Sequence, residues 1–367
     1  MKLQKVEVFL VRAKLKQPFK IALGEITFSE GYIVRLETKD GTEGFGEASP
    51  SRTILGDDME IALRSFRDIA SEIMNYDPLD YEKWGSRLSR LGASSSARAA
   101  IDMALFDIIG KHYGAPLYQL LGGYRERVET DYTIGIKSKD AAVNEALELV
   151  KKGFRILKIK VGEDLESDLE RVRAIREAVG DSVKIRVDAN QGWSFTEAVR
   201  AVKELEKCEV ELLEQPLEAK DLRGLAKLRR ISKIPIMLDE SVHNAEDAIY
   251  AIKIGAADVI NIKLMKSGGI REAWKIAHIA EAAGIPCMVG CMSETEVGIL
   301  AGVHFACGLG NVVYADLDAD LMIVDHVLRI GTIEIPYRVP PPGPGLGFGS
   351  EDLNKELLKK VLEVTAH

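Results

Sequence analysis

Five ionisable residues recur at nearly even intervals along the middle of the chain, each at the end of an apolar stretch. They are Lys160, Asp188, Glu214, Asp239 and Lys263, which lie 28, 26, 25 and 24 residues apart. Three carboxylates together suit a hard divalent cation. Two lysines that flank them could carry protons to and from a bound molecule. The pattern therefore indicates a metal-dependent proton transfer.

The even spacing also indicates which structure holds these residues. About 25 residues accommodate one strand, one helix and two short loops of a (β/α)8 barrel, whose functional residues lie at the carboxyl ends of its strands. The five residues would then share one face of an α/β barrel. We predict its eight strands at 129–134, 156–160, 183–188, 210–214, 235–239, 258–263, 285–289 and 312–316.

A smaller α+β unit is predicted before the barrel. Residues 1 to about 50 alternate in polarity and favour an antiparallel meander, with a loop at 19–30. A helical pattern follows, including a helix that begins near Ser94–Ser96 and ends at Gly114.

The α+β unit is predicted to be a capping domain over the barrel. We place its boundary at Gly122-Gly123, so that it spans 1–125, is completed by 321–367, and leaves 126–320 as the barrel. Near the end, 340–347 reads as a loop and 353–363 as a short helix.

Composition narrows the class of protein. The chain has 367 residues and a net charge of −8, which argues against nucleic acid as a partner. Its first residues interrupt apolar positions with charges, so we expect neither a signal peptide nor a membrane span. Its four cysteines form no CxxC pair, which is typical of reduced thiols in a cytoplasmic protein, and its six histidines do not cluster as zinc ligands.

The three carboxylates are predicted to bind one ion. Asp188, Glu214 and Asp239 end three successive strands, which lie about 4.8 Å apart in a sheet. Oxygen ligands without cysteine or histidine favour Mg²⁺ over zinc. An acid at a strand end can also merely cap the next helix. Three acids at three successive strand ends fit a shared ion better than three separate caps.

The lysines are predicted to be acid/base groups. Lys158 and Lys160 are two apart in one strand and so point to the same side, where each should lower the pKa of the other. Lys263 would face the metal from the opposite side. One lysine on each face of a carbon favours two-base racemisation, in which one removes a proton and the other returns one.

These residues resemble the enolase superfamily, in its muconate-lactonising-enzyme-like subgroup. The KxK of strand two, the Asp, Glu and Asp of strands three to five, and the lysine of strand six are all matched here. The resemblance implies that Lys160 and Lys263 are the catalysts, with Lys158 assisting, and that one Mg²⁺ per subunit stabilises an enediolate. It also implies that Asn190 and Glu240 support the ligands, and that the protein is a homo-oligomer.

Strand eight narrows the substrate class. Asp316, Asp318 and Asp320 follow one another at period two, and a carboxylate pair at the barrel mouth is a receptor for a cation. Dipeptide epimerases of this subgroup have a DxD motif here, which receives the free α-ammonium of a dipeptide. Asp316 and Asp318 match it best, with Asp320 further out. The resemblance thus implies epimerisation at the C-terminal residue of a dipeptide, unless these acids only cap a helix.

The capping segments should select the side chain. By resemblance, Phe19, Gly24, Ile54 and Ser293 are expected to line the substrate pocket. Relatives that act on Ala-Glu resemble each other in a basic residue where Gly24 stands here. Lys20 or Arg52 could replace it, and Glu25 leaves a cationic side chain possible. The mainly apolar segments favour a hydrophobic or small side chain.

Other functions stay open at this stage. The chain could be an L-Ala-D/L-Glu epimerase proper, or a cycloisomerase or lyase of the muconate or o-succinylbenzoate type. A barrel that binds metal without turnover would lack a catalytic group, and none is missing. An unrelated metal-dependent aldolase would not need lysines on opposite sides of the mouth.

Overall fold

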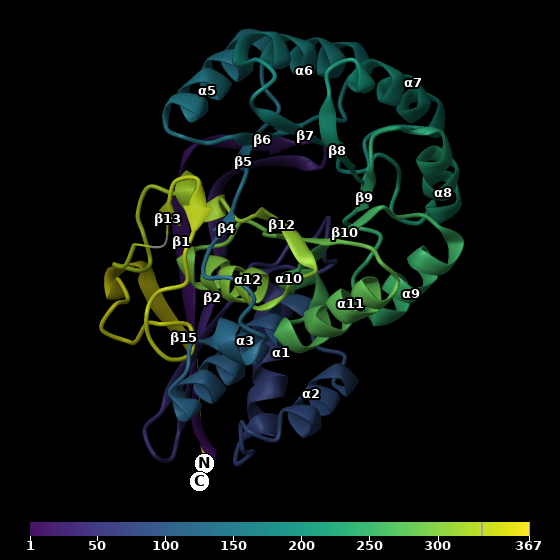
Figure 1. Cartoon of the computed structure of the whole chain (residues 1–367). Helices are drawn as coiled ribbons and strands as arrows, with labels where there is room; N and C mark the ends of the chain where they lie inside the picture. Colours follow the sequence, from purple (N-terminus) through teal and green to yellow (C-terminus); the bar gives the residue numbers. More distant parts are fainter. Residues whose placement is uncertain (332, 367) are drawn as a thin grey trace.

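The computed structural model describes residues 1–331 and 333–366. It shows a ring of strands with helices around it, and beside the ring a sheet with helices of its own (Figure 1). The first and last strands of the chain lie side by side in that second sheet. The two parts meet over one mouth of the ring, which is where the ionisable residues gather.

The ring is an eight-stranded parallel barrel, as predicted. Its strands follow the order of the chain, from β5 to β12. The Asp131 amide donates to the Ala315 carbonyl over 3.3 Å, which brings the chain ahead of the first strand against the last. The strands are β5 (Tyr132–Ile134), β6 (Ile156–Lys160), β7 (Lys184–Asp188), β8 (Val210–Glu214), β9 (Ile236–Leu238), β10 (Val259–Lys263), β11 (Cys287–Gly290) and β12 (Val312–Asp316).

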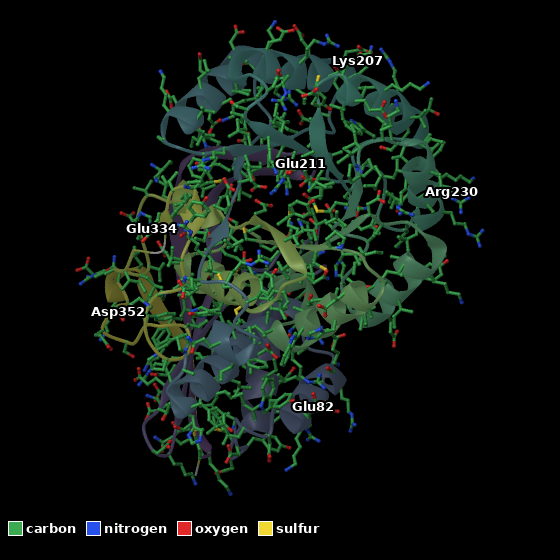
Figure 2. All side chains as sticks on the ribbon, viewed as in Figure 1. Glu82, Lys207, Glu211, Arg230, Glu334 and Asp352 are labelled. Carbon is green, nitrogen blue, oxygen red and sulfur yellow. The ribbon has the colours of Figure 1, made fainter. Side chains whose placement is uncertain are left out.

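Helices connect these strands on the outside of the barrel. They are α5 (Lys139–Lys151), α6 (Leu165–Val179), α7 (Phe195–Glu206), α8 (Leu222–Ile231), α9 (Ala245–Ile254), α10 (Leu264–Ser267), α11 (Ile270–Ala282) and α12 (Glu296–Gly308). Helices α10 and α12 are buried along their whole length, whereas the others also carry exposed residues, and Figure 2 shows Lys207 and Arg230 on the outer rim of the ring. After β12 the chain makes only a 3-10 turn, η1 (Ala319–Met322), before it leaves the barrel.

The second sheet has four antiparallel strands in the order β15-β1-β2-β3. They are β1 (Leu3–Ile21), β2 (Gly24–Thr38), β3 (Glu43–Ala48) and β15 (Leu358–Thr365). Four helices accompany it, namely α1 (Met59–Ile73), α2 (Tyr81–Arg90), α3 (Ser95–Tyr113) and α4 (Leu117–Leu120). The predicted ends of α3 are confirmed, because Ser94 caps its start and Gly114 ends it at a φ of 65°.

Helix α3 packs very closely on β3. A Cβ atom on Gly44 or Gly46 would lie only 2.1 or 2.0 Å from a carbonyl oxygen of α3, so no larger residue fits at either position. This contact fixes β3, and with it Glu47, between the helix and the barrel.

Two sequence predictions in the capping sheet are wrong. Residues 353–363 do not form a helix: only η2 (Lys355–Leu357) turns, and β15 then pairs with the free edge of β1 from Lys5↔Thr365 to Val11↔Leu358. Pairing with the otherwise unpaired edge of β1 stabilises this charged segment as a strand more than its helical propensity stabilises a helix. Residues 19–30 are likewise not a loop, because β1 and β2 continue as a hairpin in which Ile21 lies opposite Gly24.

The predicted first barrel strand is also divided. β4 (Val128–Glu129) joins a small sheet with β14 (Tyr337–Arg338) and β13 (Ile333–Glu334), and only β5 belongs to the barrel. The Thr130 amide donates to the Pro336 carbonyl over 3.0 Å, so the returning chain holds this end of the segment outside the ring. Within the described ranges, no helix has the length and apolar character needed to cross a membrane.

Candidate active site

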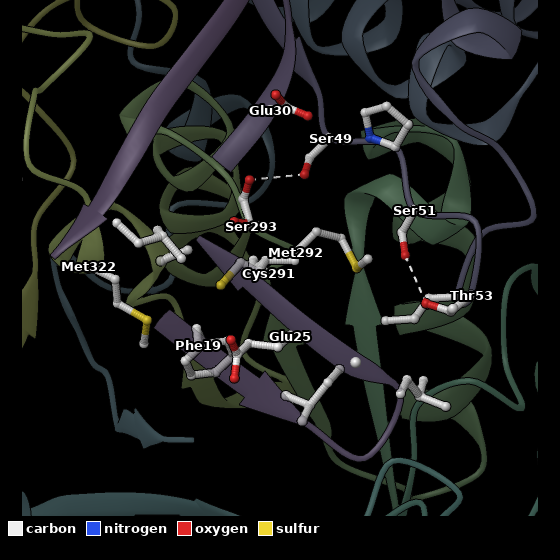
Figure 3. Close-up of a pocket in the computed structure, with 18 of the residues that line it drawn as sticks. Phe19, Glu25, Glu30, Ser49, Ser51, Thr53, Cys291, Met292, Ser293 and Met322 are labelled. Carbon is white, nitrogen blue, oxygen red and sulfur yellow. Dashed lines mark hydrogen bonds between the residues drawn. The ribbon is translucent and has the colours of Figure 1, made fainter. Parts of the chain in front are cut away.

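The predicted site residues stand at the carboxyl ends of neighbouring strands. Lys160, Asp188, Glu214, Lys263 and Asp316 are the last residues of β6, β7, β8, β10 and β12. Asp239 follows β9 directly. A cavity of about 440 Å³ opens above them, bounded by the barrel on one side and by the capping hairpin and the loop at 49–59 on the other (Figure 3).

The three predicted metal ligands are buried and held by their neighbours. The backbone amide of Asn190 donates to Asp188 Oδ1 over 2.9 Å, and the side chain of Asn261 donates to Glu214 Oε1 over 2.7 Å. These bonds fix one oxygen of Asp188 and one of Glu214. The second oxygen of each points to the middle of the site, where it contacts Lys158. Asp239 receives no such amide and contacts two ammonium groups instead.

Several oxygen atoms at this centre accept no hydrogen bond of regular geometry. Within the described residues they include Glu214 Oε2, both carboxylate oxygens of Asp239, Glu240 Oε2 and Asn261 Oδ1, all of them buried. Glu214 Oε2 and the two Asp239 oxygens are instead ion-paired with buried lysines, whereas a buried oxygen without any partner is costly in a folded protein. A set made only of oxygen donors suits a hard divalent cation such as Mg²⁺. Asp188, Glu214 and Asp239 therefore fit a metal of this kind.

The loops that follow these ligands are strained in a way that turns the chain back sharply. Asn190, Gln191 and Gln215 all have positive φ angles, of 40°, 68° and 33°. Residues other than glycine adopt such angles rarely, and chiefly where surrounding contacts hold them. The turn after β7 brings Asn190 over the site, where it accepts from Lys160 over 3.0 Å and donates to Glu240 over 3.1 Å.

The two predicted catalytic lysines lie on separate sides of the carboxylates. Lys160 Nζ is 2.6 Å from Asp188 Oδ2, and Lys263 Nζ is 2.8 Å from Asp239 Oδ2. Both line the cavity. The pKa of Lys263 is raised: burial would lower it, but Asp239 outweighs that effect. Each lysine is thus paired with a different carboxylate.

The expectation that Lys158 has a depressed pKa is wrong. Its Nζ lies 2.7 Å from Glu214, 2.8 Å from Asp316 and 3.0 Å from Asp188. Burial would lower the pKa of Lys158, but these three carboxylates outweigh it and raise that pKa well above its usual range. Sequence spacing showed the neighbouring ammonium of Lys160 and could not show the acids from other strands.

Asp316, at the end of β12, and Asp318, two residues later, both line the cavity. Thr133, on β5, contacts both: its amide donates to Asp318 over 2.6 Å, and its hydroxyl donates to Asp316 over 3.2 Å. Burial and the charge of Asp316 raise the pKa of Asp318 to about 7. The sulfur of Cys291 lies 3.9 Å from Asp318. Asp320 points elsewhere and pairs with the buried Arg338.

The predicted residues of the side-chain pocket all reach the cavity. Phe19, Gly24, Ile54 and Ser293 line it, together with Ile26, Met59, Met292 and Met322. The bases that could recognise an acidic side chain are already paired. Lys20 lies 2.7 Å from Glu163, and Arg52 contacts Asp58. Glu25 also borders the cavity, beside Phe19 in Figure 3.

Sequence reasoning missed Lys266 and Asn261. Lys266 is fully buried, lies 2.6 Å from Asp239 Oδ1, and donates to the carbonyls of Val242 and Asn261 over 3.0 Å each. Period two would have placed Asn261 on the same face of β10 as Lys263. Nothing in the sequence marks Lys266 as buried, because its four-residue helix has no periodicity to read.

Lys266 should hold Asp239 in place. Replacing it with Met should lower the free energy of unfolding by roughly 3 kcal/mol or more, because it leaves one oxygen of a buried carboxylate and three backbone carbonyls without their donor. Mg²⁺ affinity should also fall, because Asp239 loses this contact. Chemical denaturation measures the first effect, and calorimetric titration with Mg²⁺ measures the second. Lys253→Met, at an exposed position of α9, is the control. Unchanged stability and metal affinity in Lys266→Met would contradict this role.

Two family models match the chain. "Mandelate racemase / muconate lactonizing enzyme, N-terminal domain" matches residues 4–122, and "Enolase C-terminal domain-like" matches residues 141–352. The first match covers the capping sheet and its helices, and the second covers most of the barrel.

Several of the similar proteins are dipeptide epimerases by name, and another is an N-succinyl-L-Arg/Lys racemase. A hydrophobic dipeptide epimerase of Enterococcus faecalis is 45% identical over 87% of this chain and 91% of its own length. An L-Ala-D/L-Glu epimerase of Bacillus subtilis is 41% identical over 95% and 97%. The solved dipeptide epimerase of E. faecalis with Mg and L-Leu-L-Tyr superposes with a TM-score of 0.92 at 42% identity, covering 95% of this chain and 99% of that one.

Proposed function

We infer from the membership of this chain in the mandelate racemase and muconate-lactonising enzyme family that it is a Mg²⁺-dependent dipeptide epimerase. The observation that carries this proposal is a buried group of lysines and carboxylates that borders one cavity. Lys160 and Lys263, which pair with Asp188 and Asp239, line this cavity, and so does the acidic pair of Asp316 and Asp318. A dipeptide carries a carboxylate, which a metal held by Asp188, Glu214 and Asp239 would bind, and an ammonium group, which the acidic pair complements.

Asp188, Glu214 and Asp239 would hold the Mg²⁺ ion. When bound, the ion neutralises negative charge on the substrate carboxylate and so makes the neighbouring α-proton more acidic. Lys158 stays protonated among its three carboxylates, and its ammonium adds positive charge at the same place. Burial of the whole group strengthens these interactions, since little water is present to screen them.

Lys160 and Lys263 would transfer the proton. They approach from separate sides, so one can remove the α-proton of the C-terminal residue while the other supplies a proton to the opposite face. Asn190 and Glu240 would support this arrangement, because Asn190 accepts from Lys160 and donates to Glu240. The reaction interconverts the two configurations at that carbon.

The cavity walls favour a hydrophobic or small side chain. Phe19, Ile26, Ile54, Met59 and Met322 are apolar, Lys20 is not part of the cavity lining, and Arg52, which borders it, contacts Asp58. This arrangement supports the hydrophobic substrate class, which the name of the E. faecalis relative also gives, over the L-Ala-D/L-Glu class of the B. subtilis relative.

We also propose that the protein is a cytoplasmic homo-oligomer. The four cysteines are free thiols, which suits a reducing compartment. The oligomeric state rests on the family resemblance and is checked by light scattering.

Asp318 should control the binding of the substrate ammonium. Because its pKa is near 7, KM for dipeptides should rise by up to tenfold per pH unit as the pH falls below 7, when Asp318 becomes protonated. Asp318→Asn should raise KM by roughly 30-fold at pH 8, the value of one charged hydrogen bond, and should remove this pH dependence. Steady-state kinetics between pH 5.5 and 9 measure both effects.

The matching substrate test uses N-acetyl dipeptides, which lack the ammonium group. The wild-type protein should process them at least about 100-fold less efficiently than free dipeptides. Equal turnover of the two would contradict the proposed role of Asp316 and Asp318 and would favour a cycloisomerase, a lyase or an acylamino-acid substrate.

A further inference from the structure

One wall of the substrate cavity consists of residues 291–295, which follow β11 and precede α12. We call these residues the wall segment. Cys291, Met292 and Ser293 line the cavity, and Cys291 contacts Asp318. The segment therefore stands beside the acidic pair of Asp316 and Asp318.

The capping sheet provides the contacts that fix the wall segment. The carbonyl of Ser293 accepts hydrogen bonds from two hydroxyl groups, from Ser29 on β2 over 2.6 Å and from Ser49, which follows β3, over 3.0 Å. Both serines are buried, and Figure 3 shows the Ser49 contact. A carbonyl with two buried hydroxyl donors is held on both of its acceptor sites.

Glu47 makes a second and stronger attachment. Its carboxylate accepts the amide of Thr295 over 2.8 Å, the hydroxyl of Thr295 over 2.6 Å and the amide of Gly298 over 2.8 Å. These donors are the start of α12, where amides lack partners inside the helix and where negative charge is favoured. Glu47 is 1% exposed, so water offers no substitute for these bonds.

The start of α12 is packed closely against Glu47 and Glu294. A Cβ atom on Gly298 would lie 2.3 Å from Glu294 Oε2 and 3.2 Å from Glu47 Oε2, so the helix start rests directly on two carboxyl groups. Glu294 in turn accepts the amide of Met292 over 2.8 Å, within the wall segment itself. On the other side of Glu47, β3 is pressed against α3 by the contacts of Gly44 and Gly46.

We propose that Glu47, a residue of the capping sheet, is a positioning residue that sets the wall segment and thereby the substrate affinity of the cavity. It touches neither the metal-binding carboxylates nor the lysines. Its loss should therefore weaken substrate binding while leaving the chemical step nearly unchanged. The kinetic part of this inference rests on the proposed function, whereas the structural part does not.

Cys291 reports directly on the wall segment without any substrate. It is half-buried, while Cys208, Cys287 and Cys307 are buried. Glu47→Gln should raise the rate at which a thiol reagent labels Cys291 by about tenfold or more, because glutamine places an N–H donor against the donors that now bind the carboxylate. KM should rise by a similar factor, with kcat within about twofold of wild type.

Four further variants keep the test decisive. Asp107→Asn removes a buried carboxylate that accepts the amide of Phe45 on the same strand, and it should leave the Cys291 labelling rate unchanged. Thr295→Val should reproduce the effect of Glu47→Gln, and Thr295→Ser should restore wild-type behaviour. If Glu47→Gln does not fold, Ser49→Ala removes one bond to Ser293 and should show a smaller increase in labelling.

The outcomes separate this inference from the proposed function. Unchanged labelling of Cys291 in folded Glu47→Gln or Thr295→Val would overturn it, as would faster labelling with no change in KM. The inference is supported if Cys291 is labelled faster in Glu47→Gln and Thr295→Val than in wild type, while Thr295→Ser is labelled at the wild-type rate. If no variant, nor the wild type, acts on any dipeptide, the proposed function fails, and the labelling rates alone decide whether Glu47 sets the wall segment.

Discussion

Lys160→Ala and Lys263→Ala should each abolish epimerisation of dipeptides. A positioned acid/base group contributes about 10²- to 10⁴-fold to a proton transfer, so kcat should fall by roughly 10³-fold or more in either variant. Each variant keeps one lysine on one face of the α-carbon. It should therefore still exchange the proton of a single epimer with solvent, the opposite one in the two variants, and the double variant should exchange neither.

The measurement is proton exchange in D₂O, followed separately for the two epimers of one dipeptide by NMR. Lys184→Ala serves as the control, because Lys184 stands at the opposite end of the barrel, where it pairs with Glu211 over 2.7 Å. Substantial exchange by the double variant, or exchange of the same epimer by both single variants, would contradict the two-base assignment.

Removing one of the three central carboxylates should strongly weaken the affinity for Mg²⁺. Glu214→Gln keeps the shape of the side chain and its contact with Asn261 but removes a negative charge from the centre. We expect Mg²⁺ affinity to fall on the order of 100-fold or more, since hard cations depend on charged oxygen ligands. Activity should fall with it. Calorimetric titration of the metal-free protein with Mg²⁺ measures the affinity without reference to turnover.

Glu211→Gln is the matched control, on the same strand and of the same chemistry. Glu211 pairs with Arg186 over 2.8 Å at the other end of β8, away from the cavity, and Figure 2 shows it inside the ring of helices. Its replacement should leave Mg²⁺ affinity unchanged. Equal affinity in Glu214→Gln and wild type would show that Asp188, Glu214 and Asp239 do not form the metal site.

The barrel and the grouping of its site residues were predictable from the sequence because a parallel barrel is locally periodic. Each strand end is about 25 residues from the next, so Asp188, Glu214 and Lys263 could be placed on one face by counting. The ends of α3 were predictable for a similar reason, since Ser94 and Gly114 act on the residues next to them.

The rest depended on contacts between distant parts of the chain. Residues 358–365 become a strand because the edge of β1 is free, and their partners in β1 lie about 350 residues earlier in the chain. The pKa of Lys158 depends on Asp316 and Glu214, which come from other strands. The sequence around Glu47 likewise gives no sign that the carboxylate of this residue caps a helix of the barrel.

Deuterium uptake from D₂O tests the central claim most directly. A mixed library of L,L-dipeptides would be incubated with the protein and Mg²⁺, and uptake at the α-carbon of the C-terminal residue would be measured by mass spectrometry. We expect deuterium uptake when Mg²⁺ is present, and the highest uptake in dipeptides with hydrophobic or small C-terminal side chains. Uptake led by glutamate-terminated dipeptides would contradict our interpretation of Gly24 and the cavity walls. No uptake in any dipeptide, by folded and metal-loaded protein, would contradict the epimerase assignment itself.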